Sequence, residues 1–244
     1  MSTPKTALIL GATGQTGGHL LKALLSSPHY SKVYEYGRRL SNEKSDKLVQ
    51  KTINFDEIGQ EGGAFGDVDG KAKWDVVFIT LGTTRANAGS AEAFERIDRE
   101  YVLRAAREAK SNDPEIKQRI IYCSSGGANS KSSFLYARSK GLTEEGIASL
   151  GYSDTIIFRP GLLVGTARPQ TRLPETAASV ITGLLAYVSD RFEIKVAQLG
   201  KAIANAGYLG SDGLPQEVNA TRIYDGKATL ITNPGALKLA AMEV

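Results

Sequence analysis

The sequence contains very little cysteine and histidine. Its single cysteine, Cys123, excludes an intrachain disulfide and is typical of a protein in a reducing compartment. The two histidines, His19 and His29, have no cysteine or acidic neighbours at metal-ligand spacing, so the sequence predicts no metal site. Cys123 ends one apolar run and Trp74 precedes another, and we interpret both as packing residues.

Long apolar runs and a dominant charge are also absent. No run approaches the roughly 18 residues that are needed to span a bilayer. The 30 lysines and arginines exceed the 26 acidic residues by a net charge of +4, and no basic block indicates binding to nucleic acid. The first apolar run, Ala7 to Leu10, lies so near the start that a cleaved targeting peptide of ~15–30 residues would remove it. We therefore expect a cytoplasmic protein with no transmembrane segment and no nucleic-acid partner.

Short apolar runs alternate with amphipathic stretches along the 244 residues. The runs typical of buried strands are Thr6–Leu10, Val33–Tyr36, Lys51–Phe55, Asp75–Thr80, Arg119–Cys123, Thr155–Phe158 and Ala228–Thr232. The stretches with helical spacing are Gly17–Ser26, Ala91–Lys110, Tyr136–Leu150, Glu175–Val188 and Ile194–Ala206. This α/β pattern predicts a doubly wound parallel sheet, the Rossmann fold, in a single domain over residues 1–244. The pattern loosens after Pro160, so we expect residues 161–244 to form a small C-terminal cap on the substrate side.

Two polar segments are interpreted as solvated. The stretch Ser41 to Lys47 has no apolar periodicity and predicts a surface loop. Asp98, Arg99 and Glu100 alternate in charge within a predicted helix, which is typical of a solvent-facing helix surface with local ion pairs.

A glycine-rich turn directly follows the first predicted strand. It reads Gly11-Ala12-Thr13-Gly14-Gln15-Thr16-Gly17 and leads into a helix, which is a G-x-x-G-x-x-G pattern. The first glycine permits a sharp turn, the second lets the backbone approach a pyrophosphate, and the third allows the helix to pack closely on the strand. The positive end of the helix then faces the phosphates. We therefore predict a dinucleotide site at this turn.

The end of the second predicted strand indicates which dinucleotide is bound. Proteins that prefer NAD usually place an acidic residue there to accept hydrogen bonds from the adenosine ribose. Here the strand runs into Gly37-Arg38-Arg39, and guanidinium groups bind phosphate through paired, charge-assisted hydrogen bonds. The sequence therefore favours NADPH over NADH, with Arg38 and Arg39 at the 2′-phosphate.

A candidate catalytic group follows the strand Arg119–Cys123. Ser124 and Ser125 end that strand, and the next predicted helix opens with Tyr136 and Lys140, which share a helix face at i and i+4. A phenol with a pKa near 10 becomes an efficient acid–base group when a nearby ammonium favours its phenolate. Tyr136 is therefore the predicted proton donor and Lys140 the group that tunes it. A serine hydroxyl would hold the substrate oxygen, and both serines remain candidates.

Together these motifs resemble the atypical branch of the short-chain dehydrogenase/reductase superfamily. Within that branch the chain is similar to a group that includes an animal Tat-interacting tumour suppressor and a fungal mitochondrial outer-membrane protein. The resemblance extends from about Thr6 to Gly165 and is carried by the segments Gly11–Gly17, Gly37–Arg39, Leu81–Arg85, Ile97–Val102, Ser124–Gly126, Ser132–Tyr136, Lys140 and Phe158–Gly161. Many members have an asparagine-rich turn where this chain has Leu81-Gly82-Thr83-Thr84, so a complete proton relay is not implied.

The resemblance implies further cofactor contacts. The pyrophosphate would contact the glycine-rich turn, the fourth strand end would lie along the cofactor, and Lys140 and Tyr136 would approach its nicotinamide ribose. The cofactor contacts that the resemblance implies are Thr13, Gly14, Thr16, Gly17, Arg38, Arg39, Leu81, Gly82, Leu163 and Arg172.

Two functions are compatible with these residues. The first is an NADPH-dependent reductase that transfers hydride to a small carbonyl compound. The second is an NADPH-binding regulatory or interaction protein with little or no turnover, which the resemblance also implies. The resemblance adds peripheral attachment to the cytosolic face of the mitochondrial outer membrane as an alternative location. Substrate identity depends on the irregular region after Gly161, where shape matters more than motif.

Overall fold

The computed structural model describes residues 3–59, 65, 74–165 and 193–244. Its centre is an eight-stranded sheet in the order β3-β2-β1-β4-β5-β6-β10-β9. The strands are β1 (Lys5–Leu10), β2 (Tyr30–Gly37), β3 (Leu48–Thr52), β4 (Val76–Ile79), β5 (Arg119–Cys123), β6 (Asp154–Arg159), β9 (Thr221–Ile223) and β10 (Ala228–Thr232). Neighbouring strands pair in parallel except for β9 and β10, which are antiparallel. The predicted doubly wound, mainly parallel sheet is confirmed.

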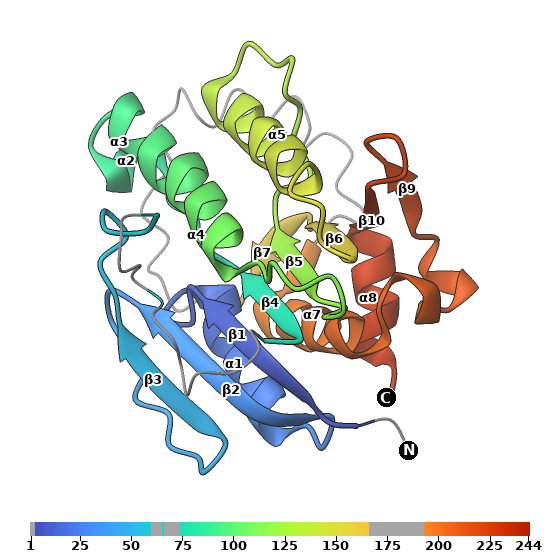
Figure 1. The fold of residues 1–244 in the computed structure, drawn as a ribbon. Helices are drawn as coiled ribbons and strands as arrows, with labels where there is room; N and C mark the ends of the chain where they lie inside the picture. The colour runs from blue at the N-terminus through green and yellow to red at the C-terminus, as the bar shows by residue number, and fades with distance from the viewer. Residues whose placement is uncertain (1–2, 60–64, 66–73, 166–192) are drawn as a thin grey trace.

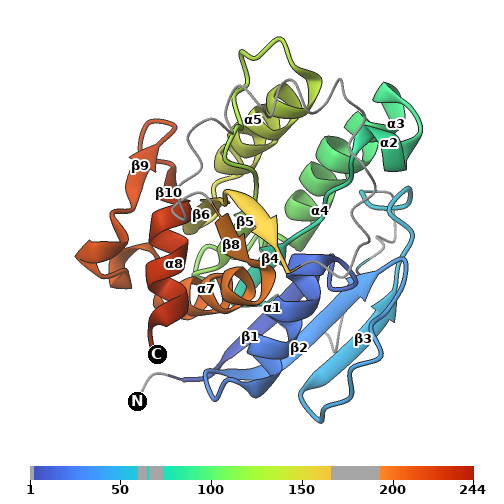
Figure 2. The same cartoon turned by 180° about the vertical axis from the view of Figure 1, so that it is seen from behind.

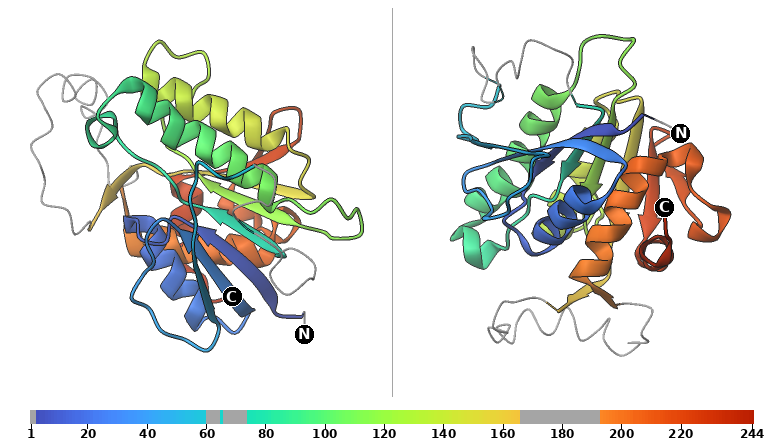
Figure 3. Two further views of the ribbon diagram at one scale, coloured as in Figure 1. Left: turned by 60° about the vertical axis from the view of Figure 1, so that its left-hand side comes forward. Right: turned by 90° about the horizontal axis from the view of Figure 1, so that it is seen from below.

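Two layers of helices enclose this sheet (Figure 1, Figure 2 and Figure 3). Helices α4 (Tyr101–Ala109) and α5 (Leu135–Ala148) lie in front of it in Figure 1. On the opposite face lie α1 (Gln15–Ser26), α7 (Val196–Leu209) and α8 (Asn233–Ala241). The shorter elements are α2 (Arg85–Ala88), α3 (Ala91–Glu95), a π-helical turn (Arg96–Glu100), two 3-10 turns (Ser211–Gly213 and Gln216–Val218) and the separate strand pair β7 (Leu162–Val164) and β8 (Glu193–Lys195). None of the described helices is long and apolar enough to cross a membrane.

Burial on both faces explains why the strands have continuous apolar sequences. In β1, Ala7 and Ile9 pack toward α1 and α7, whereas Leu8 and Leu10 pack toward α4. All four side chains are inaccessible to solvent. A parallel sheet covered by helices on both sides selects such runs rather than alternating polar and apolar residues. Burying one leucine or isoleucine side chain contributes roughly 1.5–3 kcal/mol, so β1 anchors both halves of the core.

Some of the observed boundaries differ from those predicted from the sequence. The third strand was predicted at Lys51–Phe55, but it is β3 at Leu48–Thr52. This strand lies at the sheet edge, where it is only half-buried, so its pairing with β2 fixes it more than its apolar content does. The predicted helix Ile194–Ala206 begins later, at Val196, because its first residues form β8. The predicted helix Glu175–Val188 lies outside the described residues.

Residues 193–244, which were predicted to belong to a cap, contribute to the central sheet and to one helical layer. Strand β10 pairs in parallel with β6 and extends the central sheet. Helix α7 packs directly on α1, where Gly200 permits the contact, because a Cβ atom there would lie 2.7 Å from the Leu20 nitrogen. Residues 193–244 therefore complete the sheet and one helical layer, and the extent of a substrate-side cap remains a prediction.

The close approach of α1 and α7 predicts that Gly200→Ala destabilises the protein. The new methyl group would meet backbone atoms of His19 and Leu20, which cannot move without shifting α1. We expect a loss of roughly 1–3 kcal/mol in the free energy of unfolding, as for other overpacked interiors. Urea denaturation measures this loss, with Gly127→Ala as the control, because a Cβ at Gly127 meets no atom within 4 Å. Equal stability of the two variants would contradict this close packing of α1 on α7.

Candidate active site

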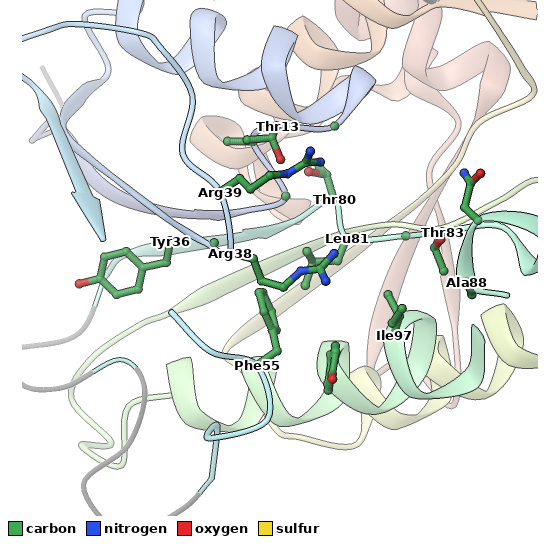
Figure 4. A pocket seen from close by; sticks show the side chains of 17 residues that line it. Thr13, Tyr36, Arg38, Arg39, Phe55, Thr80, Leu81, Thr83, Ala88 and Ile97 are labelled. Carbon is green, nitrogen blue, oxygen red and sulfur yellow. The ribbon is translucent and has the colours of Figure 1, made fainter. Parts of the chain in front are cut away.

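The candidate site is a cavity of about 370 Å³ at the carboxyl ends of β1 and β4. After β3 at one edge, the chain crosses to β4 beside β1, so the strand order reverses between these two strands. Ligands of doubly wound folds bind at such reversal points. Figure 4 shows the lining side chains, which come from the glycine-rich turn, the ends of β2 and β4 and the helices that follow β4. The lining residues are Gly11, Ala12, Thr13, Gly14, Tyr36, Gly37, Arg38, Arg39, Phe55, Thr80, Leu81, Gly82, Thr83, Asn87, Ala88, Ile97 and Tyr101.

The glycine-rich turn has the geometry of an anion cradle. Gly11 adopts a φ of +98°, in the left-handed region where glycine is favoured. A Cβ atom on Gly17 would lie 2.1 Å from the Gly11 carbonyl oxygen, so only glycine allows α1 to start this close to β1. Gly14 caps α1, and the first turn of that helix contains no acidic residue. The helix therefore presents its N-terminal amide groups and positive dipole end without a competing carboxylate.

The members of this turn have different positions. Gly11, Thr13 and Gly14 line the cavity. Gln15, Thr16 and Gly17 do not line it but form the first turn of α1 behind it. Their predicted contribution to a pyrophosphate site would therefore come through backbone amides of the helix terminus, and it remains a prediction.

Two arginines make the cavity positively charged. Arg38 and Arg39 are exposed on the loop after β2 and extend into the cavity in Figure 4. They are the only charged residues among those that line the described cavity, and no carboxylate is included. This composition suits an anionic ligand rather than the bare ribose hydroxyls that an acidic residue would bind.

Phe55 and Tyr101, which were not predicted as site residues, both line the cavity. Their rings lie 5.4 Å apart between centroids. The Tyr101 hydroxyl donates to Asp56 at 2.7 Å, and Arg96 pairs with the same carboxylate. The hydrogen bonds from Tyr101 and Arg96 lower the pKa of Asp56. Residues just after a strand often line such a site, and Phe55 follows β3. The predicted strand Lys51–Phe55 placed Phe55 inside the strand and so hid this signal.

The cavity adjoins a buried ion pair at Gly82. A Cβ atom on Gly82 would lie 3.5 Å from Lys140 Nζ and 3.6 Å from Asp98 Oδ1. Lys140 Nζ lies 2.9 Å from Asp98 Oδ1, and the two side chains are 4% and 0% exposed. Lys140 also donates to the Tyr122 hydroxyl at 3.1 Å. Gly82 thus separates the ligand cavity from this cluster by a single backbone layer.

Neighbouring side chains keep Lys140 positively charged. Burial disfavours an ammonium and would lower the pKa of Lys140. The nearby Tyr122, Asp98 and Tyr136 outweigh this effect, so the pKa of Lys140 is raised. For Tyr122 the effect of burial is the opposite, and it is the main reason that the pKa of this phenol is raised. Lys140 is therefore a cation, and Tyr122 a neutral phenol, in the neutral pH range.

The interpretation of Asp98 as a solvated residue was wrong. Asp98 is fully buried in the π-helical turn, whereas its neighbours Arg99 and Glu100 form local pairs with Glu95 and Arg104. A signal for this burial was present, because Asp98 lies four residues after Phe94 and four before Val102, and both are fully buried apolar residues. Helical spacing therefore places Asp98 on the buried face, although its charge suggested the opposite.

Tyr136 lies on the first turn of α5 and is 45% exposed. The centroids of the Tyr136 and Phe94 rings lie 6.0 Å apart. Lys140 Nζ lies 6.0 Å from the centroid of the Tyr136 ring. The predicted Tyr136 and Lys140 pair is thus brought together. Neither residue lines the cavity, although Gly82, which does line it, lies next to Lys140.

The serines differ in burial. Ser124 is buried, and its hydroxyl has no hydrogen-bond partner among the described residues. Ser125 is half-buried. Ser124 lies two residues beyond Tyr122, which contacts Lys140, so β5 brings it to the same end of the sheet. Cys123 lies between them, and burial raises the pKa of its thiol to about 11.

Two further predicted cofactor contacts come from the region after β6. Leu163 lies on β7 and packs against the hydrophobic core beside α1 and α7 rather than lining the cavity. Arg172 lies outside the described residues. The remaining predicted residues after the fourth strand, Leu81 and Gly82, do line the cavity.

Comparison with known proteins agrees with this geometry. Residues 7–204 match the NAD dependent epimerase/dehydratase family. "Protein fmp52, mitochondrial" from Emericella nidulans is 32% identical over 84% of this chain and 88% of its own. "Protein HTATIP2" from Rattus norvegicus is 37% identical over 74% of this chain and 72% of its own. A solved short chain dehydrogenase family protein from Francisella tularensis covers 97% of this chain and 99% of its own, with a TM-score of 0.62 at 12% identity.

These matches confirm the resemblance that the motifs indicated. The fungal and animal relatives are those of the group named from the sequence, and the solved structure has the same fold. The chain belongs to the NAD-dependent epimerase/dehydratase family.

Proposed function

We propose that the protein is an NADPH-dependent reductase of a small carbonyl compound. The observation that carries this proposal is the continuity of two features at Gly82. On one side lies a cavity with two arginines and no carboxylate, and on the other lies the buried Lys140 close to Tyr136. Membership of a family of NAD(P)-dependent enzymes supports an oxidoreductase, and the cavity supports the choice of NADPH.

The residues of the cavity suit a phosphorylated dinucleotide. The glycine cradle between Gly11 and Gly17 leaves room for a pyrophosphate at the N-terminus of α1. Arg38 and Arg39 would bind the 2′-phosphate through charge-assisted hydrogen bonds. When bound there, NADPH supplies the hydride. Every other step of the proposed reaction depends on side chains of this chain.

The proposed proton donor is the Tyr136 hydroxyl. As the substrate carbonyl is reduced, its oxygen takes the proton from Tyr136, and a phenolate remains. The positive charge of Lys140 stabilises that phenolate, and Asp98 holds Lys140 in place as a cation. The buried, unpaired hydroxyl of Ser124 would donate a hydrogen bond to the substrate oxygen, with Ser125 as the alternative.

A second function is favoured by one specific observation. Lys140 already contacts Asp98 and Tyr122, so part of its positive charge is compensated inside the protein. This arrangement suits an NADPH-binding regulatory protein with little turnover, in which the cofactor stabilises an interaction surface. Its test is the affinity of a captured partner with and without NADPH, since a partner bound equally in both conditions would count against regulation.

The names of the relatives support a proposed location at mitochondria. The Emericella nidulans relative is described as mitochondrial, and we extend this to the cytosolic face of the outer membrane by peripheral attachment. Cell fractionation tests the extension, because recovery of the protein only in the cytosolic fraction would contradict it.

The proposed proton donor predicts that Tyr136→Phe abolishes turnover. The change keeps the ring against Phe94 and removes only the hydroxyl. We expect a loss of at least about 100-fold in kcat, while NADPH affinity stays nearly unchanged. NADPH consumption against aldehydes, ketones and quinones measures the effect. The control is Tyr34→Phe, whose hydroxyl does not line the cavity. Turnover that is unaltered in Tyr136→Phe would refute the assignment.

The arginine pair predicts loss of cofactor preference. Replacing Arg38 or Arg39 by alanine should weaken NADPH binding by about tenfold or more, because each removes charge-assisted hydrogen bonds to a phosphate. NADH has no 2′-phosphate, so its affinity should change little. Fluorescence titration of both cofactors measures this, with the exposed Arg107→Ala on α4 as the control. Equal losses for the two cofactors would argue against 2′-phosphate recognition.

The buried ion pair predicts a large cost for Asp98→Asn. The substitution leaves Lys140 without its carboxylate in a buried position. Breaking a buried pair by removing one partner destabilises proteins by about 3–5 kcal/mol, and we expect a loss in this range from urea unfolding at neutral pH. The double variant Asp98→Asn with Lys140→Met should recover part of the loss. The exposed pair of Glu100 and Arg104 provides the control through Glu100→Gln. A cost no larger than that control would show that the pair is unimportant for stability.

A further inference from the structure

A buried carboxylate close to the loop that carries Arg38 and Arg39 has no part in the proposed chemistry. Glu35 lies in β2, two residues before Gly37, and is 1% exposed. It does not line the cavity. Its oxygen atoms accept hydrogen bonds from the Ser41 backbone N–H at 2.6 Å, from the Ser41 hydroxyl at 2.7 Å and from Gln50 Nε2 at 2.7 Å. Among the described residues, the Glu35 carboxylate is therefore satisfied by neutral hydrogen-bond donors and not by a lysine or arginine.

These contacts fix both ends of the loop that carries Arg38 and Arg39. At one end, the Gly37 carbonyl accepts a hydrogen bond from the Ile53 N–H at 3.0 Å. At the other end, Glu35 holds Ser41, and Gln50 Nε2 also donates to the Ser41 carbonyl at 2.9 Å. Glu35 and Gln50 lie directly opposite each other in the pairing of β2 and β3. The loop between these points folds back tightly.

The tightness of the loop is visible at Gly37. A Cβ atom on Gly37 would lie 3.0 Å from the Arg39 carbonyl oxygen, so the chain after Arg39 returns toward the strand end. Both arginines are exposed, and the described residues give neither an ion-pair partner. Their side chains are long and lose rotamer freedom when they bind a ligand. The backbone of residues 37–41, the arginine loop, is therefore what orients them.

We propose that Glu35 is a positioning residue that orients the arginine loop for the 2′-phosphate of the cofactor. The inference rests on the proposed NADPH function. A carboxylate is suited to this position because it is an acceptor only and can receive all three donors at once. A glutamine would direct its amide N–H groups at donors of Ser41 or Gln50, and one or more of these hydrogen bonds would be lost. Glu35 acts through the loop, since it has no contact with the cavity itself.

The test compares cofactor discrimination in three variants. Glu35→Gln removes the charge at nearly constant shape. Ser41→Ala removes one of the three donors and keeps the carboxylate. Glu43→Gln is the matched control, because Glu43 lies in the segment after the loop and its partner is the exposed Lys22, at 3.5 Å. Fluorescence titration gives the dissociation constants of NADPH and NADH for each, and urea unfolding gives stability.

The expected result is a selective loss of NADPH affinity. In Glu35→Gln, NADPH should bind about tenfold more weakly while NADH stays within about twofold, because only the 2′-phosphate contacts depend on the loop. Ser41→Ala should shift the ratio of the two constants in the same direction by a smaller factor. Glu43→Gln should leave the ratio at its wild-type value.

Other outcomes separate this inference from the proposed function. An unchanged ratio in Glu35→Gln, or equal losses for both cofactors, would overturn the positioning role and leave Glu35 as a structural clamp. Should Glu35→Gln fail to fold, Ser41→Ala decides, and an unchanged ratio there overturns the inference. If Arg38→Ala and Arg39→Ala also leave NADPH affinity unchanged, the proposed NADPH function itself fails. If the arginine variants lose NADPH affinity and Glu35→Gln does not, only the role of Glu35 is lost.

Discussion

The buried ion pair of Lys140 and Asp98 is the interaction on which the site depends. It joins α5 to the π-helical turn before α4, so it sets how the two helices on one face of the sheet approach each other. It also lies next to Gly82, which lines the cavity. Two opposite charges inside a protein are costly unless they remain paired. The pair therefore helps to fix the distance between the cavity and the part of the site that contains Tyr136.

The electrostatic arrangement follows from which charges face the cavity and which lie beneath it. Arg38 and Arg39 and the positive end of α1 face the ligand space. Two buried carboxylates, Asp98 and Glu35, are each engaged by protein groups and lie outside the lining. The cavity is thus positive, although acidic residues are close to it. This separation is the physical basis for favouring an anionic, phosphorylated cofactor.

Local patterns explain what the sequence could predict. The turn from Gly11 to Gly17 is a continuous segment whose chemistry follows from adjacent residues, and the parallel strands have unbroken apolar runs. Lys140 and Tyr136 lie one helical turn apart, so their shared face was also predictable. The fold and the central part of the cavity therefore needed no information on distant contacts.

Contacts between distant segments explain what the sequence could not predict. Asp98 seemed solvated because its partner, Lys140, lies on another helix. The boundary of β3 depends on its pairing with β2, which also brings Gln50 opposite Glu35. Phe55 and Tyr101 form one wall of the cavity only because the segment after β3 packs against α4. In each case the sequence contained the residue types, but three-dimensional pairing decided their roles.

The proposed role of the cavity is to select a dinucleotide with a 2′-phosphate. The most direct measurement is the ratio of the dissociation constants of NADH and NADPH for the unmodified protein, determined by titration at a fixed, moderate salt concentration. The positive cavity predicts that NADPH binds at least about tenfold more tightly than NADH, because two guanidinium groups meet an extra phosphate. Equal affinities, or tighter binding of NADH, would contradict selection by the 2′-phosphate.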